Sequence, residues 1–176
     1  MFNIDIVFDD VSIMSVEKED ITKIEDWINS KQGFNIDASR DYGIVDFYER
    51  YLEYYVSEGE YFLKVLRDSE LIGIIKGRIE FKNPNEVWIM CYLIEFGLCD
   101  VDVATKIIDE FIKHLYKNYG IRNFYTFVSA DNKGMMKIWK NNNFEISRVT
   151  SNFLEINSKD KDILILKKGF NVNKIK

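Results

Sequence analysis

The order of predicted elements along the chain indicates an α+β fold. We expect a central, mixed, mostly antiparallel twisted sheet of about six to seven strands, flanked by about four helices. Three observations lead there: short β-type runs near both ends, two amphipathic helical segments after the first strands, and a long helical segment between two later strands. The predicted order is β-β-α-α-β-β-β-α-β-α-β-β, in one domain covering residues 1–176.

The first part of the chain predicts a β-hairpin and two helices. Residues 4–8 and 11–16 alternate or run apolar around Asp9-Asp10, which is typical of a hairpin. Residues 19–28 place apolar side chains on one helical face, and a second amphipathic helix is predicted for 44–56. The polar segment between these two helices is expected to be a loop.

The middle of the chain predicts three strands and a long helix. Residues 61–67 and 71–81 are strand-like and are joined by a predicted turn. Residues 87–94 are apolar almost without a break, which favours a strand covered on both faces. Residues 103–116 have helical periodicity, and Gly120 is the predicted C-terminal cap of that helix.

The last part predicts a strand, a short helix and a final pair of strands. Residues 124–128 are the strand, and the helix is expected to begin after Asn132. Residues 145–153 and 162–166 are expected to pair with each other.

Composition excludes several classes of function. The net charge of −5 argues against a nucleic-acid surface, and no apolar run reaches the roughly 18 residues that span a bilayer. The N-terminus lacks the features of a signal peptide, so a cytoplasmic protein is expected. Cys91 and Cys99 have no second cysteine motif or histidine cluster beside them, so we expect reduced thiols and no metal site.

Residues 132–144, NKGMMKIWKNNNF, are the most informative stretch. They resemble the late motif of the GCN5-related N-acetyltransferase (GNAT) family, N-x-x-A/S-x-x-x-Y/F-x-x-x-G-F. The resemblance extends over nearly the whole chain and is strongest from 61 to 153. It implies the GNAT fold, acetyl-CoA as cosubstrate, and Asn132 ordering the motif beside the pantetheine arm. Trp139 stands where the family usually has a Tyr that protonates the leaving thiolate, and Asn143 stands for the Gly.

Trp139 departs from the family's chemistry, because an indole N–H has no usable acidity. It is therefore expected either beside the cofactor or simply as a core aromatic residue. Water or the departing ammonium would then protonate the thiolate. Tyr92 and Tyr125 lie on neighbouring predicted strands, but the sequence favours neither as a replacement acid.

The family's diphosphate motif, Q/R-x-x-G-x-G/A, aligns with Cys99-Asp100-Val101-Asp102-Val103-Ala104. Backbone N–H groups at a helix N-terminus would hold the diphosphate. Ala104 fits the last position, whereas Cys99 and Asp102 depart from the pattern. Three interpretations of Asp102 stay open: a helix N-cap, a loop that follows a different course, or loss of acetyl-CoA binding. Lys106 is a candidate for compensating charge. The resemblance also implies that two strands separate near Leu93, Ile94 and Glu95, with Ile94 beside the cofactor.

Amine acetylation needs a base to take a proton from the substrate ammonium. Glu86, at the start of the fourth core strand, matches the offset of a Glu that is read as the base in similar N-terminal acetyltransferases. Glu95, at the other end of the strand, is the second candidate.

The acceptor is expected to be a cationic primary amine, namely a small amine, a peptide N-terminus or a lysine. Aromatic and acidic residues alternate between 42 and 61, which suits an ammonium, although they equally fit a helix packed on the core with a solvated acidic face. The alternatives are a catalytically degenerate GNAT-fold binding module and an enzyme that uses a longer acyl-CoA. A homodimer is one arrangement that the sequence leaves open.

Overall fold

The computed structural model describes residues 3–30, 51–52, 56–81, 85–156 and 159–170, with the backbone alone at 152–156 and 159–161. The described elements are β1 (Asp5–Phe8), β2 (Val11–Ser15), the 3-10 helix η1 (Lys18–Asp20), α1 (Ile21–Ser30), β3 (Glu60–Arg67), β4 (Glu70–Glu80), β5 (Glu86–Ile94), α3 (Val101–Tyr119), β6 (Asn123–Ser129), α4 (Lys133–Asn141), β7 (Glu145–Ile156) and β8 (Lys159–Gly169). The predicted helix 44–56 lies outside the described residues except for 51–52 and 56, which are helical.

The strands of the described chain form one eight-stranded sheet in the order β1-β2-β3-β4-β5-β6-β8-β7. Every neighbouring pair is antiparallel except β5 and β6. The mixed, mostly antiparallel sheet is therefore confirmed. All eight strands of the predicted order join it, one more than the six to seven expected in the sheet. The late pair is also longer than predicted.

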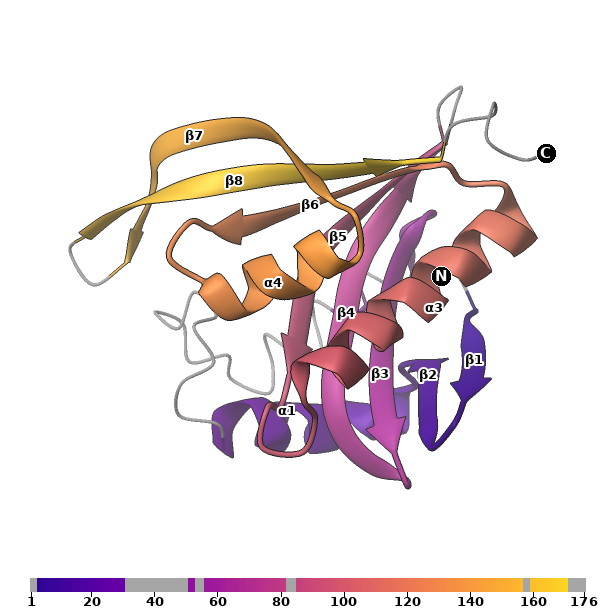
Figure 1. The fold of residues 1–176 in the computed structure, drawn as a ribbon. Coiled ribbons are helices and arrows are strands. Elements are labelled where there is room, and N and C mark those ends of the chain that lie inside the picture. The colour runs from indigo at the N-terminus through magenta and orange to yellow at the C-terminus, as the bar shows by residue number, and fades with distance from the viewer. Residues whose placement is uncertain (1–2, 31–50, 53–55, 82–84, 157–158, 171–176) are drawn as a thin grey trace.

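Helices cover both faces of the sheet (Figure 1). On one face α3 and α4 contribute Phe111, Ile138 and other apolar side chains to the larger core cluster. On the other face α1 contributes Ile21 and Ile24 to a second cluster with residues of β3 and β4. The periodic apolar residues of the predicted helices are thus the ones that pack against the sheet.

The prediction that both faces of β5 are covered was wrong for the first half of this strand. Val87 and Ile89 are buried towards α3 and α4. On the opposite face Cys91 and Leu93 pack against the α1 cluster, but Trp88 is only half-buried. Met90, which follows Trp88 and Ile89, is 43% exposed.

The parallel pairing of β5 and β6 is short. It runs from Glu86 opposite Asn123 to Ile89 opposite Thr126, and the two strands then diverge (Figure 1). At this point the register of β5 against β4 shifts by one residue at Met90, which forms a β-bulge. The Thr126 hydroxyl donates to the Ile89 carbonyl at 2.9 Å, closing the last position of the pair. We call the gap beyond this pair the β5–β6 opening. It begins at Met90, before the predicted Leu93–Glu95 position.

Local sequence signals account for the helix ends at this site. Gly120 ends α3 with a φ of 66°, as predicted. Asn143, which follows α4, has a φ of 61°. Asn is the non-glycine residue that tolerates this left-handed conformation best. It can therefore take the place of the motif's Gly without changing the backbone.

Candidate active site

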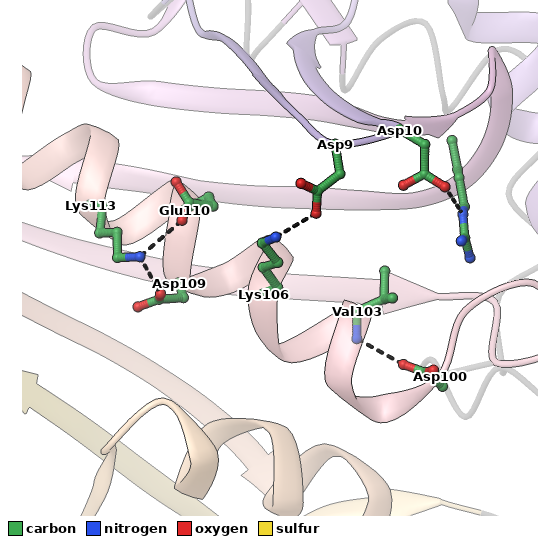
Figure 2. Close-up of polar contacts among 9 residues, drawn as sticks. Asp9, Asp10, Asp100, Val103, Lys106, Asp109, Glu110 and Lys113 are labelled. Atoms are coloured by element: carbon green, nitrogen blue, oxygen red, sulfur yellow. Dashed lines mark hydrogen bonds and ion pairs between the residues drawn. The ribbon is translucent and has the colours of Figure 1, made fainter.

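The N-terminus of α3 lies directly after the loop that leaves β5. Its N-cap is Asp100, whose side chain accepts a hydrogen bond from the Val103 N–H at 2.8 Å (Figure 2). The Ala104 N–H bonds the Asp100 carbonyl at 3.0 Å. The interpretation of Asp102 as the N-cap was therefore wrong by two positions, because the helix begins at Val101.

The first turn of α3 retains backbone donors for an anion. The N–H groups of Val101 and Asp102 have no acceptor within the helix, since they precede the first intrahelical bond. The Asp102 side chain is exposed to solvent. Its carboxylate is favoured by the helix dipole but competes with any anion bound there. The residues present fit a diphosphate through main-chain donors and not through side chains.

Cys99 and Ala104 shape this end of the helix by burial. The Ala104 side chain is completely buried, and its carbonyl accepts a hydrogen bond from the Tyr92 hydroxyl at 2.9 Å. Cys99 is 3% exposed, and burial raises the pKa of its thiol to about 11. The thiol stays protonated at neutral pH, so Cys99 adds no negative charge beside a phosphate.

Arg67 is a cation that contacts the loop between β5 and α3. Its Nη1 donates to the Leu98 carbonyl at 3.1 Å, and its Nε donates to Asp10 at 2.6 Å. The hydrogen bond from Arg67 holds the pKa of Asp10 below its usual value. By contrast, Lys106 points to the β1–β2 turn and pairs with Asp9 (Figure 2). The loop's supporting charge therefore comes from β3 and not from α3.

Replacing Arg67 with Met is expected to weaken acetyl-CoA binding about 3- to 10-fold, because the loop loses its hydrogen bond at the Leu98 carbonyl and its link through Arg67 to the partly exposed Asp10 carboxylate. Isothermal titration calorimetry would measure the change. Arg78→Met is the matched control, since Arg78 pairs with Glu80 on an exposed part of β4. Equal affinities in the two variants would contradict a supporting role for Arg67.

The main chain at the end of β5 faces the opening at Ile94. The Leu93 carbonyl points towards Gly73 of β4, and the Glu95 N–H bonds the Ile72 carbonyl at 2.8 Å. Main-chain groups of successive residues in a strand point to opposite sides. The N–H and carbonyl of Ile94 consequently face away from β4, on the side where β6 has diverged.

The α4 motif is built largely from core contacts. Asn132 is the N-cap, and its side chain accepts from the Met135 N–H at 3.1 Å. Trp139 is 2% exposed and packs edge-on against Tyr92 and Phe144, with ring centroids 6.0 Å and 5.0 Å apart. Trp139 is therefore a core residue of the cluster beneath α3 and α4, in agreement with that interpretation of the sequence.

Tyr92 is a poor replacement for the missing acid. Its hydroxyl already donates to the Ala104 carbonyl, and burial raises its pKa well above the usual value near 10. A free thiol has a pKa of about 8.5, so a thiolate would take a proton from such a phenol only unfavourably.

The two predicted base candidates lie at opposite ends of β5. Glu86 is half-buried, and the Tyr125 hydroxyl donates to its carboxylate at 3.4 Å. Glu95 is also half-buried, and the Trp27 indole N–H donates to it at 3.2 Å. Eight strand steps separate Glu86 from Ile94, about 26 Å. The structure therefore does not bring Glu86 and Glu95 together.

Tyr125 is a contact of Glu86 that sequence reasoning did not identify. Its ring stacks on Trp88 with centroids 4.8 Å apart, and Lys167 lies 5.2 Å from the ring centroid. Only the strand register, which puts Tyr125 opposite both Trp88 and Lys167, reveals this group. No pattern in the sequence indicates that pairing.

The predicted acceptor region between 42 and 61 lies mostly outside the described residues. Of its aromatic residues that are described, Tyr51 is 7% exposed and Tyr61 is completely buried. Both therefore belong to the core rather than to a surface that an ammonium could reach.

Across the described residues, no group of three or more His, Cys, Asp or Glu side chains could hold a metal ion. In the same part of the chain, no helix has the length and apolar character of a membrane span.

Residues 13–165 match the family model of the acetyltransferase (GNAT) domain. A comparison with curated proteins finds no significant relative in sequence. Solved structures, however, are similar over almost the full chain. The ribosomal-protein-S5-alanine acetyltransferase from Vibrio fischeri has a TM-score of 0.76 at 12% identity, covering 98% of this chain and 100% of its own.

Two further structures share the fold. A chimera of the spermidine N-acetyltransferase SpeG from Vibrio cholerae and hSSAT has a TM-score of 0.80 at 14% identity, covering 92% of this chain and 96% of the other. The microcin C7 self-immunity acetyltransferase MccE, in complex with acetyl-CoA and AMP, has a TM-score of 0.78 at 16% identity, covering 93% and 94%. At these identities the similarity establishes the fold. With the domain match over most of its length, the chain belongs to the GNAT family of acetyltransferases.

Proposed function

We propose that this protein is an N-acetyltransferase that moves an acetyl group from acetyl-CoA to a primary amine in a ternary complex. The observation that carries the proposal is the β5–β6 opening next to the N-terminus of α3. The opening offers unpaired strand backbone to an extended ligand, and the helix offers N–H donors to its anionic end. The two features occur in the same GNAT domain and lie at the two ends of one short segment, from Met90 to Val101.

Each part of the chain has a separate task in this proposal. The first-turn N–H groups of α3, within the loop Cys99–Ala104, hold the diphosphate. The main chain of Ile94 binds the pantetheine arm, while Asn132 caps α4 beside it and Trp139 supports this helix from the core. When bound, acetyl-CoA supplies the thioester whose acetyl group is transferred. Glu86, or else Glu95, accepts the proton of the substrate ammonium, directly or through water.

Acetyl-CoA at one hundred times its dissociation constant is expected to stabilise the protein by about 2.7 kcal/mol. In a domain of this size that corresponds to a rise of about 5–11 °C in Tm. Differential scanning fluorimetry with acetyl-CoA checks the expectation, with ADP as a control that lacks the pantetheine arm. An unchanged Tm at millimolar acetyl-CoA would count against the proposal.

Activity is tested by following thiol release from acetyl-CoA with a panel of primary amines. The similar structures include enzymes named for alanine of a ribosomal protein and for spermidine, so the panel should include peptide N-termini and polyamines. Replacing acetyl-CoA with longer acyl thioesters in the same assay tests the choice of acyl donor.

A binding module without catalysis is the second candidate function. It is favoured by the buried Trp139 in place of an acidic Tyr and by the exposed Asp102 carboxylate at the diphosphate motif. The two candidates give different results: binding of acetyl-CoA without thiol release on any amine would support the module, and release would exclude it.

A further inference from the structure

An apolar surface borders the β5–β6 opening on the face of the sheet that carries α1. The last residue pair of β5 and β6 is Ile89 and Thr126. The next residues, Met90 on β5 and Phe127 on β6, are 43% and 41% exposed. Trp88 and Tyr125, which come two residues earlier on the same strands, stack on each other. Ile165 of β8 is the cross-strand partner of Phe127. We call these five residues, Trp88, Met90, Tyr125, Phe127 and Ile165, the aromatic platform.

On the other face of the sheet, apolar residues near the opening are buried. Ile94, Val128 and Ile138 are buried there with the rest of the α3 and α4 cluster. An acceptor that reaches the diverging strands from the α1 face must therefore pass over the platform, where Met90 and Phe127 are exposed. Exposed apolar side chains that gather at one place mark binding sites more often than single exposed ones do.

The charges around the platform do not suit a polycation. Residues that pair across neighbouring strands lie on the same face of the sheet, so the strand register shows which described charged residues surround the platform. They include the cations Lys76, Arg78, Arg148 and Lys167 and the carboxylates Glu80 and Glu86. Arg78 binds Glu80 at 2.5 Å, and Lys167 lies over the Tyr125 ring that also contacts Glu86. Among the described residues, the carboxylates here are thus matched by nearby cations.

We infer that the acceptor is an amine carried next to a large apolar group, such as the amino group of an apolar amino acid or of a peptide that begins with one. The apolar group would cover Met90 and Phe127, and its amine would lie at the opening. This inference rests on the proposed N-acetyltransferase function and narrows its substrate. A polyamine has no group that could cover the platform, and it would meet the cations Lys76, Arg78, Arg148 and Lys167.

Matched acceptors test the inference. L-phenylalaninamide and L-alaninamide carry the same amino group and differ in the apolar substituent, and spermidine represents the polyamines. Thiol release from acetyl-CoA gives kcat/KM for each. We expect kcat/KM for phenylalaninamide to exceed the value for alaninamide by about 10-fold or more, because an apolar pocket discriminates by factors of this size. N-acetyl-phenylalaninamide, which lacks the amine, should give no release.

A variant ties the preference to the platform. Phe127→Ala should lower the phenylalaninamide-to-alaninamide ratio at least 3-fold. Phe127 is 41% exposed, so the substitution leaves no large buried cavity and the variant is expected to fold. Val7→Ala, at an exposed position on the distant edge strand β1, should leave the ratio unchanged.

The outcomes separate this inference from the proposed function. Release with equal kcat/KM for both amides, or with spermidine preferred, overturns the inference and leaves the N-acetyltransferase standing. A preference for phenylalaninamide that Phe127→Ala does not reduce also overturns it, because the selecting surface would lie elsewhere. No release with any amine overturns the proposed function and the inference with it.

Discussion

Glu86→Gln is expected to lower kcat/KM for the acceptor amine by about 100-fold at neutral pH, if Glu86 is the base of the proposed reaction. A primary amine is mostly protonated at this pH, and a glutamine cannot accept its proton. The loss should shrink as the pH rises towards the pKa of the amine, where the neutral nucleophile is present without a base. A pH profile of kcat/KM for the wild type and the variant checks both expectations.

Glu95→Gln is the matched comparison, since both carboxylates are half-buried and each accepts a hydrogen bond from an aromatic residue. An amide oxygen can still accept from Tyr125, so Glu86→Gln should keep its Tm within about 2 °C. A large loss of kcat/KM in Glu95→Gln, with little loss in Glu86→Gln, would indicate that Glu95 and not Glu86 is the base. Wild-type values of kcat/KM in Glu86→Gln at every pH would exclude Glu86 as the base.

Gly77→Ala should be strongly destabilising, by about 3 kcal/mol or more. A Cβ at position 77 would lie 2.0 Å from the Trp88 carbonyl oxygen and 2.4 Å from the Tyr61 hydroxyl. That hydroxyl donates to the same carbonyl at 3.0 Å, so relieving the contact breaks a hydrogen bond and moves β4 from β5. Overpacking costs about 1–3 kcal/mol and a lost buried hydrogen bond adds about 1–3. Chemical denaturation measures the difference in free energy of unfolding.

Gly134→Ala provides the control for Gly77→Ala. Gly134 lies in the first turn of α4, and the nearest atom to an added Cβ is 3.9 Å away. Alanine favours a helix over glycine by up to about 1 kcal/mol, so this variant should be as stable as the wild type or more stable. If both variants unfold at the wild-type denaturant concentration, the close approach at Gly77 is not a constraint. Because Gly77 faces the bulge in β5, its variant should also weaken acetyl-CoA binding.

Local patterns were sufficient to predict most of the fold. The hairpin turn at Asp9-Asp10, the helix that ends at Gly120 and the helix capped by Asn132 all depend on residues within a few positions of each other. Such contacts are encoded by periodicity and capping residues, which can be read in a sequence. The resemblance to the GNAT motif then assembled these elements in the right order.

The site was predicted less well because its geometry depends on pairing between distant segments. The bulge at Met90 needs the register of β4, and Arg67 reaches the loop after β5 only because β3 ends beside it. An apolar run also has the same appearance whether one face or both are buried, so the exposure of Met90 could not be foreseen. The N-cap error at Asp102 arose because two aspartates stand two residues apart, and either could cap.

The short seam between β5 and β6 also determines how the molecule assembles. Its partners lie 37 residues apart in the chain, whereas β4 follows β3, β5 follows β4 and β8 follows β7 through short connections. Contacts across longer separations, which include the β2–β3 and β6–β8 pairs, cost more chain entropy and form later in folding. The units β3–β4–β5 and β7–β8 should therefore form before the four residue pairs of β5 and β6, with α3 as the crossover. The vertex of the opening is created in that later step, and a ligand bound across it would hold β5 and β6 together.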